Sequence, residues 1–522
     1  MKWTVPWRTG RAKRNARPVG MGESESTSTG HSDAPRVGEG TGQAIGTAGA
    51  GQPMALRPEF IVDHVLRILD GIESAAPELA PQVGELRGVM AAPPRFLVTG
   101  RMKAGKSTLV NALVRNRIAA TAVLECTDAV TVYVDGLSEH IGPLDWPLGA
   151  PGESTASVRM HVMPSAALKN MSFVDAPGLG SLDFRNRELA HGAARMRKGL
   201  GFDGWESIDA AVYVFDSVLR ADELDFVRGL GFGSLGTVGV LSRADDFAEG
   251  AFGDADPMAA AEAHAADLAE HWQGWFSGVL PVSALMSQTA ETGGVTEDIA
   301  ARLATLGGLP RREAIRELER EDPQLLGPEV RRDLLADFGA YGVLEGREIA
   351  AGGGVALRDW LRVASGMERL RSHLLGDAAY AAALARAGKV IAAARQLAFD
   401  AHDARAVTAA IDGAADPAAK WRIDLYPLLA RLESDGMAND VAGLVSGALT
   451  ADSAASLARQ PYGGPAAEIA GALDVLLLEA RTRLTGFPAP AEEAALTILS
   501  GVYARAAAEM RGEIADSGLF PN

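Results

Sequence analysis

Short apolar runs, most of them separated by helical stretches, mark the chain from residue 94 to about residue 285. Five runs end in polar or glycine-rich loops: RFLVTG, MSFVDAPG, AAVYVFD, TVGVLSRADD and VLPVSAL. Strands that are apolar almost throughout belong to a sheet covered on both faces, and such sheets bind ligands at the carboxyl ends of their strands. The pattern predicts a doubly wound α/β domain with a mostly parallel sheet over residues 93–290.

A helical period replaces the strand pattern on either side of this domain. Three stretches carry an apolar stripe: the first follows the i, i+3, i+4, i+7 rule, and the other two alternate spacings of three and four residues. They are Val62, Val65, Leu66, Leu69 and Ile72; Trp360, Val363, Met367, Leu370 and Leu374; and Leu496, Leu499, Tyr503, Ala506 and Met510. We expect a neck helix region at 56–92, begun by Pro58, and an elongated helical neck and trunk bundle at 291–522. The first and last of these helices should join that bundle. The pattern leaves 290–350 unassigned.

Residues 1–55 contain almost nothing that a core could bury. Glycine, serine and threonine dominate the part after residue 20, so we expect a disordered tail. The first 17 residues are basic, include Trp3 and Trp7, and contain no acidic residue. Such a tail could touch an anionic surface, but it lacks an amphipathic helical period, and a solvated tail is the favoured interpretation.

Composition and charge narrow the class of protein. The chain has 522 residues, of which 47% are hydrophobic, enough for two or three domains. A net charge of −17 argues against nucleic-acid binding, and the single cysteine, Cys126, excludes a disulfide framework. No apolar run approaches the roughly 18 residues that span a bilayer, and no signal-peptide pattern opens the chain. We expect a cytoplasmic protein with peripheral membrane contact.

The sequence GRMKAGKST joins a predicted strand to a predicted helix. This is the setting of a P-loop, whose backbone N–H groups and helix N-terminus bind nucleotide phosphates. Within it we assign Lys106 to the β- and γ-phosphates and Ser107 to Mg²⁺. The expected phosphate-binding residues are Gly100, Lys103, Ala104, Gly105, Lys106, Ser107, Thr108 and, further along the chain, Gly178.

Two further segments complete the expected phosphate and metal site. Asp175 in VDAPG follows another strand, and we expect it to hold Mg²⁺ through water while the Gly178 N–H faces the γ-phosphate. A GTPase also needs a threonine that closes over Mg²⁺ and the γ-phosphate. Thr127, in the loop of VLECTDAVTVY, is the preferred candidate; Thr131, in a run with strand character, and Thr121 are the alternatives.

The sequence LSRADD indicates which base is read. The carboxylate of Asp245 can accept from both N1–H and the N2 amine of guanine, whereas adenine would leave the buried carboxylate unpaired. Arg243, beside Ser242, can cover the base with its flat guanidinium. In VSAL, Ser283 and Ala284 form the second guanine-side loop, with the Ala284 N–H directed at O6. GTP is therefore the expected nucleotide.

Taken together, GRMKAGKSTLVNAL, DAPG, SRAD and VSAL resemble the motifs of the dynamin superfamily of large GTPases, and the helical flanks agree with its architecture. Within it, the chain is similar to the bacterial dynamin-like proteins of the isoniazid-inducible and septal types. The resemblance implies Mg²⁺-dependent GTP hydrolysis, self-association through GTPase domains and membrane remodelling. The septal type further implies a second dynamin-like protein or a septal membrane-associated partner, at the inner face of the cell membrane, and a role in cell division.

The P-loop departs from this family at the catalytic positions. Eukaryotic dynamins hold a monovalent cation with a serine and orient water with a glutamine, where this chain has Lys103 and Met102. Leu179 replaces the water-orienting glutamine of small GTPases. We expect Lys103 to supply the cation in cis, as an arginine does in guanylate-binding relatives. The alternatives are a solvent-directed Lys103 and an Arg101 that reaches across a dimer. The expected catalytic residues are Lys103, Lys106 and Thr127.

The predicted trunk offers little that would bind lipid directly. Residues 421–522 hold seven arginines, no lysine and thirteen acidic residues, a balance that anionic lipid repels. LYPLLARL at 425–432 is a candidate insertion loop, although a buried bundle helix is the favoured interpretation. Two functions stay open: a membrane-remodelling GTPase, and a slow GTP-switched scaffold that binds protein partners.

Overall fold

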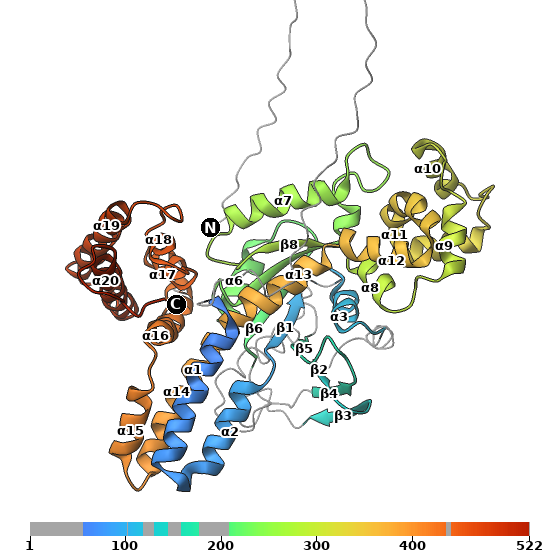
Figure 1. Ribbon diagram of the computed structural model, residues 1–522. Helices are drawn as coiled ribbons and strands as arrows, with labels where there is room; N and C mark the ends of the chain where they lie inside the picture. The colour runs from blue at the N-terminus through green and yellow to red at the C-terminus, as the bar shows by residue number, and fades with distance from the viewer. Residues whose placement is uncertain are drawn as a thin grey trace, which may run out of the picture. The chain divides into compact units, whose positions relative to one another are not determined.

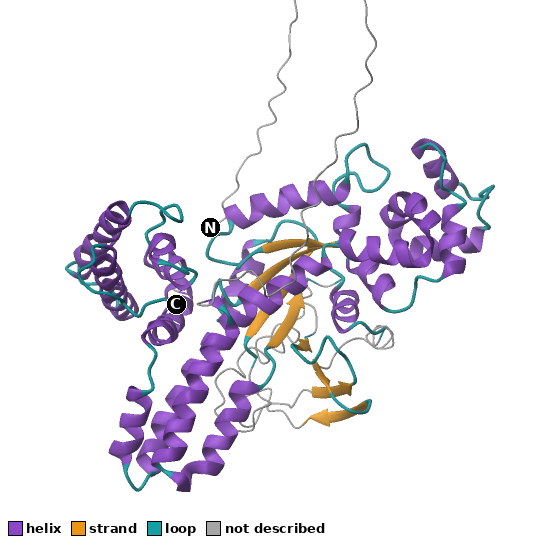
Figure 2. Cartoon of the chain, in the orientation of Figure 1, coloured by secondary structure: helices purple, strands orange, loops and turns teal. Residues whose placement is uncertain are grey.

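A central sheet flanked by helices carries the predicted motifs (Figures 1 and 2). The computed structural model describes residues 56–101, 103–117, 130–144, 158–176, 208–434 and 440–520. Over these residues the sheet has eight strands in the order β3-β4-β2-β5-β1-β6-β7-β8. The strands are β1 (Arg95–Gly100), β2 (Val130–Asp135), β3 (His140–Leu144), β4 (Val158–Met163), β5 (Ser172–Asp175), β6 (Ala210–Phe215), β7 (Thr237–Ser242) and β8 (Val279–Val282).

The sheet is mostly parallel, as the strand pattern predicts. β1 pairs in parallel with β5 and β6, β6 with β7, β7 with β8, and β2 with β4. The antiparallel pairs are β2 with β5 and β3 with β4. The five apolar runs form β1 and β5 to β8. β3 is the edge strand and β4 lies between β3 and β2; neither has such a run, because polar residues such as Arg159 and His161 interrupt the apolar ones.

Helices cover both faces of the sheet, which confirms the doubly wound fold. On one face, α3 and α13 pack against Phe96 and Val98 of β1. On the other face, α6 and α7 pack in the cluster that contains Leu97, the strand residue between those two. The helical elements here are α3 (Lys106–Val114), α6 (Ala221–Leu230), the 3₁₀ turn η4 (Ala244–Asp246), α7 (Pro257–His271), α8 (Ala284–Glu291) and α13 (Met367–His373).

Four more helices follow α8 and share the core of this second face. Leu303, Phe338 and Leu357 belong to the same hydrophobic cluster as Leu97 of β1. The helices are α9 (Glu297–Ala304), α10 (Arg311–Glu319), α11 (Pro328–Ile349) and α12 (Gly353–Ala364), with the 3₁₀ turn η5 (Ala350–Gly352) between the last two. The stretch that the sequence pattern left unassigned is therefore helical and packs with the sheet.

The 360–374 stripe, which was assigned to the seam of the helical bundle, does not lie along one helix. The chain breaks between α12 and α13, where Gly366 has φ 73° and where a Cβ would collide with the backbone O of Pro281. Val363 is 63% exposed, whereas Met367 and Leu370 pack under the sheet. The spacing of apolar residues continues across the break by coincidence. It carries no information about the close contact with β8, which requires a glycine at position 366.

The remaining helices form a bundle with a single core. α1, α2 and α14 run side by side (Figure 1). The apolar stripe of α1 (Val65, Leu69) and that of α20 (Leu496, Leu499) lie in one hydrophobic cluster, so both helices join the bundle as expected. The elements are α1 (Pro58–Ala75), the 3₁₀ turn η2 (Pro77–Leu79), α2 (Ala80–Ala91), the π turn η6 (Leu374–Ala378), α14 (Ala379–Asp400), α15 (Ala404–Gly413), α16 (Pro417–Ser434), α17 (Asp440–Leu449), α18 (Ala454–Leu457), α19 (Ala466–Leu484) and α20 (Pro490–Met510).

The candidate insertion loop LYPLLARL lies inside α16. Leu425, Tyr426 and Leu429 are buried in the bundle core, which confirms the bundle-helix interpretation. None of the helices in the described part of the chain is long and apolar enough to cross a membrane. The predicted disordered tail, residues 1–55, lies outside the described residues.

Candidate nucleotide site

The loop between β1 and α3 has the backbone of a phosphate-binding loop. Gly100, the last residue of β1, has φ 138° and lies so close to β6 that a Cβ would collide with the backbone O of Val214. Gly105 adopts the left-handed conformation, with φ 86°, directly before the first turn of α3. Both positions need glycine, and they lead the loop backbone to the N-terminus of a helix, where anions bind. Ala104 is buried in this loop, and Ser107 and Thr108 are half-buried in the first helical turn.

Lys106 and Asp175 form a buried pair of opposite charges at this loop. The Nζ of Lys106 donates to the backbone O of Arg101 at 2.9 Å and to that of Gly100 at 3.4 Å. Burial lowers the pKa of Lys106, and the Asp175 charge opposes that shift. Burial raises the pKa of Asp175, at the end of β5, to about 6, while Lys106 acts to lower it. Both groups are thus held in a poorly solvated place where added charges interact strongly.

The oxygen donors at this end of the sheet suit Mg²⁺. A buried carboxylate such as Asp175 is stabilised by a cation, and Ser107 offers a hydroxyl from α3, which packs on β5. No group of three or more His, Cys, Asp or Glu side chains within the described ranges could hold a metal ion. Mg²⁺ is commonly held by one or two protein oxygens together with substrate phosphates, so the small donor set fits this ion.

The loops that would close over the phosphates fall outside the described residues. Thr127, Thr121 and Gly178 lie there, as do Met102 and Leu179. Their roles stay predictions. The alternative threonine, Thr131, is half-buried in β2, opposite Asp175 in the antiparallel ladder.

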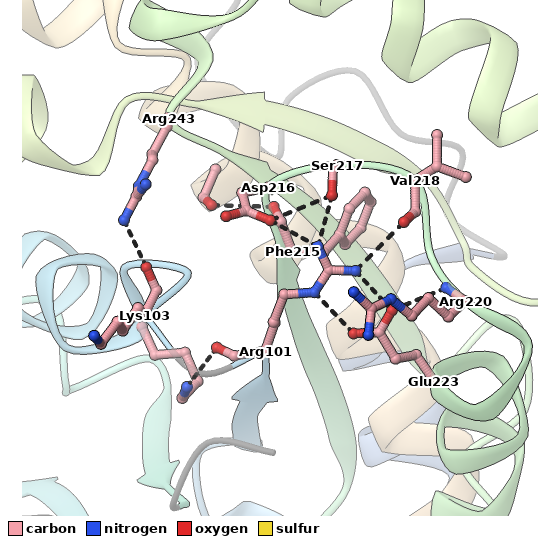
Figure 3. A network of polar contacts seen from close by, with 11 residues as sticks. Arg101, Lys103, Phe215, Asp216, Ser217, Val218, Arg220, Glu223 and Arg243 are labelled. Atoms are coloured by element: carbon pink, nitrogen blue, oxygen red, sulfur yellow. Dashed lines mark hydrogen bonds and ion pairs between the residues drawn. The ribbon is translucent and has the colours of Figure 1, made fainter. Parts of the chain in front are cut away.

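Arg243 joins the guanine-side loop to the phosphate loop. It adopts φ 55° directly after β7, and its Nη2 donates to the backbone O of Lys103 at 2.7 Å (Figure 3). The preceding Ser242 is buried, and its Oγ donates to the backbone O of Phe215 at 3.0 Å. This bond connects two loops that are 140 residues apart in sequence, and the base-covering role of the guanidinium stays a prediction.

The other expected guanine-binding residues lie together at the ends of β7 and β8. Asp245, in η4, is half-buried; burial raises the pKa of its carboxyl, and a hydrogen bond with the Ser283 side chain acts against that shift. The Ser283 side chain also caps α8 by accepting from the backbone N of Met286 at 3.4 Å. Ala284, the first residue of α8, is buried. A half-buried carboxylate beside a helix N-terminus can accept from a guanine edge.

Arg101 is anchored within the chain, which argues against its reaching across a dimer. Its Nε and Nη2 donate to Glu223 of α6 at 2.9 and 2.8 Å, and its Nη1 donates to Asp216 at 2.9 Å and Ser217 at 2.6 Å (Figure 3). Hydrogen bonding to Glu223 raises the pKa of Arg101. This network was not predicted from the sequence, where the available signal was an acidic residue directly after an apolar strand, as in VFDS.

Lys103 is exposed, and its backbone has φ 62°. Its carbonyl binds Arg243, while its side chain lies at the surface of the loop (Figure 3). The expected phosphate-binding role of the Lys103 side chain stays a prediction.

The fold and the P-loop geometry define a GTPase domain. Residues 95–229 match the family model described as 50S ribosome-binding GTPase. The chain is also 31% identical over 309 residues to the isoniazid-induced protein IniC from two strains of Mycobacterium tuberculosis. This homology confirms the resemblance to the isoniazid-inducible type of bacterial dynamin-like protein. The match covers 52% of this chain and 59% of IniC, so the chain spans less than two thirds of these relatives.

Solved structures give weaker likenesses. A chain from "an oligomerised bacterial dynamin pair" that senses and tethers membranes is 14% identical, with 87% of this chain and 75% of that chain covered and a TM-score of 0.31. An S. thermophilus NFeoB mutant bound to GDP is 13% identical, with 52% of this chain and 99% of that chain covered and a TM-score of 0.21. TM-scores this low carry no argument about the whole chain.

Proposed function

We propose that this chain is a dynamin-like GTPase that binds GTP with Mg²⁺ and hydrolyses it to drive self-association and membrane remodelling. The observation that carries the nucleotide assignment is the bond from Arg243 to the Lys103 carbonyl. It holds the guanine-side loop against the phosphate loop, so one nucleotide can occupy both. Asp245, in the turn that follows Arg243, would then accept from the donor edge of guanine.

The phosphates would lie on the loop that begins at Gly100. Lys106, whose Nζ now donates to two backbone carbonyls, would exchange these acceptors for β- and γ-phosphate oxygens. Gly105 and the first turn of α3 would direct backbone N–H groups at the same oxygens. Ser107 and Asp175 would hold Mg²⁺, the latter through water, and the ion would add positive charge beside the phosphates.

Hydrolysis requires a water to attack the γ-phosphorus while the bond to the β-phosphate oxygen breaks and negative charge grows on that oxygen. Lys106 would offset part of this charge. We propose that Lys103 supplies the second positive charge in cis, and that Thr127 closes over the γ-phosphate. The matching alternative gives the Lys103 side chain no part in turnover and leaves its carbonyl to hold Arg243.

The base assignment is tested by Asp245→Asn, with Asp246→Asn as the matched control because Asp246 is the adjacent, exposed acid. An asparagine offers N–H where guanine also offers N–H, and xanthine presents the complementary carbonyl. We expect Asp245→Asn to bind XDP better than GDP in a fluorescence titration, while Asp246→Asn keeps the preference for GDP. A retained GDP preference in Asp245→Asn would refute the assignment.

We propose that the assembled form works at a membrane as a peripheral protein, with a second dynamin-like protein or a septal membrane-associated partner. The acidic, lysine-free sequence of 421–522 and the burial of LYPLLARL favour recruitment through such a partner over direct lipid contact. The same observations support the second candidate, a slow GTP-switched scaffold for protein partners. Co-sedimentation with anionic liposomes separates the two candidates, with GTP turnover measured alongside. GTP turnover that lipid stimulates in the presence of a candidate partner supports the membrane-remodelling GTPase. GTP turnover that neither lipid nor a candidate partner stimulates supports the scaffold.

A further inference from the structure

The helices that follow α8 bring a backbone kink against the guanine-side loop. α11 packs against both η4, which contains Asp245, and α8, which begins at the second guanine-side loop. Inside α11, Gly339 leaves the helical conformation, with φ 69° and ψ 169°. The predicted guanine subsite is therefore bordered by a segment that lies more than 90 residues beyond Asp245 in the chain.

Gly339 leaves no room for a side chain beside Asp245. A Cβ at position 339 would lie 2.9 Å from Oδ2 of Asp245 and 3.7 Å from Leu285 Cδ2. The first distance is shorter than real Cβ contacts allow, and φ 69° disfavours any residue with a Cβ. The Asp245 carboxylate therefore has two neighbours. The Ser283 side chain hydrogen-bonds with it, and the backbone of α11 at Gly339, which has no side chain, lies close to its Oδ2.

The kink is tied to two other parts of the nucleotide domain. Thr289 Oγ1, on α8, donates to the backbone O of Asp337. Arg117, just beyond the end of α3, donates through Nη2 to Asp337 Oδ1 at 3.4 Å and through Nε to Thr292 Oγ1 at 2.9 Å. These bonds attach the residue two positions before Gly339 to α8 and to the segment that follows α3.

We propose that Gly339 is a positioning residue for base recognition: the kink of α11 sets the tilt of the Asp245 carboxylate, so that both oxygens can accept from guanine. This inference rests on the proposed function, because it takes Asp245 as the residue that reads the base. The ligand class is a 6-oxopurine nucleotide with a 2-amino group. Inosine nucleotides lack that amine and report on the second hydrogen bond.

The test compares Gly339→Ala with Gly308→Ala. Gly308 lies in the same group of helices and has φ 79°, but a Cβ there meets nothing within 4 Å, so it reproduces the backbone strain without the contact. Binding of GDP, IDP and ADP is measured by fluorescence titration on the full chain, and folding is checked by circular dichroism. We expect Gly339→Ala to weaken GDP binding roughly tenfold or more, as for loss of a hydrogen bond to a charged group. The GDP-to-IDP affinity ratio should fall toward one, whereas Gly308→Ala should keep the wild-type ratio.

A GDP-to-IDP ratio in Gly339→Ala equal to that of Gly308→Ala and the wild type would overturn the inference. If Gly339→Ala does not fold, Thr289→Val decides, because it removes the bond to Asp337 without touching Asp245. A lowered ratio supports the positioning role and an unchanged ratio overturns it. Wild-type protein that binds ADP as tightly as GDP would instead refute the proposed base assignment.

Discussion

Replacing Arg386 by methionine should weaken the attachment of the bundle helices α2 and α14, called the neck below, to the sheet of the GTPase domain. Arg386 lies on α14, and its guanidinium binds Asp209, directly before β6, through Nε at 2.8 Å and Nη2 at 2.5 Å. It also donates to the backbone O atoms of Val89, Ala92 and Pro93, which lead from α2 to β1. One side chain therefore connects the bundle helices α2 and α14, which share one core, to the segment that begins β6 of the sheet.

The cost of this change follows from burial. The Asp209 side chain is 0% exposed and that of Arg386 is 7% exposed. Removing the guanidinium leaves a buried carboxylate without its ion-pair partner and three part-buried carbonyls without this donor, and breaking a buried pair in this way costs about 3–5 kcal/mol. Because about 1.4 kcal/mol corresponds to a factor of ten, amides of α14 should exchange with solvent about two to three and a half powers of ten faster.

Hydrogen exchange and denaturant unfolding of Arg386→Met measure this cost. The control is Arg395→Met on the same helix, where the arginine is exposed and the effect should stay within about 0.5 kcal/mol. The double variant Arg386→Met with Asp209→Leu should recover much of the loss, since it removes both buried charges. Equal protection of α14 in Arg386→Met and Arg395→Met would refute the view that this ion pair holds the neck to the sheet.

Three further outcomes follow from the structure. Gly100→Ala should abolish nucleotide binding or folding, because its Cβ meets the Val214 backbone; a variant with wild-type melting temperature and GDP affinity would contradict the close packing of the P-loop on β6. Burial raises the pKa of Glu433 from 4.5 to about 7, although two hydrogen bonds from Ser234 act to lower it. Because the folded chain then holds this proton more tightly than the unfolded chain, the free energy of unfolding should fall as pH rises from about 5 to 8. Glu433→Gln should flatten the corresponding fall in melting temperature. Lys103→Ser should slow GTP turnover and make it sensitive to potassium; unchanged, potassium-independent turnover would exclude a catalytic ammonium.

Much of the nucleotide domain could be predicted because its signals are local. Five apolar runs became strands, and the loop after the first has the φ values that its glycines suggest. The strands β3 and β4 escaped detection because polar residues such as Arg159 and His161 interrupt their apolar residues, so neither is a continuous apolar run. The break at Gly366 escaped detection because it depends on contact with β8, which no spacing in the sequence reveals.

In the candidate site, too, some residues could be predicted from the sequence and their contacts could not. Residue types and spacing identified Lys106, Asp175 and Asp245 as candidates, since each lies beside an apolar strand that ends in a loop. The partners of neighbouring groups could not be predicted: Arg101 binds Glu223 from 122 residues away, and Arg243 binds the carbonyl rather than the side chain of Lys103.

The sequence by itself determined the class of domain, because a phosphate-binding loop depends on glycine positions and on a strand and helix that are contiguous in the chain. It also indicated the apolar stripes by which α1 and α20 join the bundle. Only the tertiary structure decided that α11 borders the guanine side, that Gly339 leaves room for Asp245, and that Arg386 holds the neck. Those contacts join residues about 90 or more positions apart, and their energies depend on burial and geometry that arise only when the distant segments pack together.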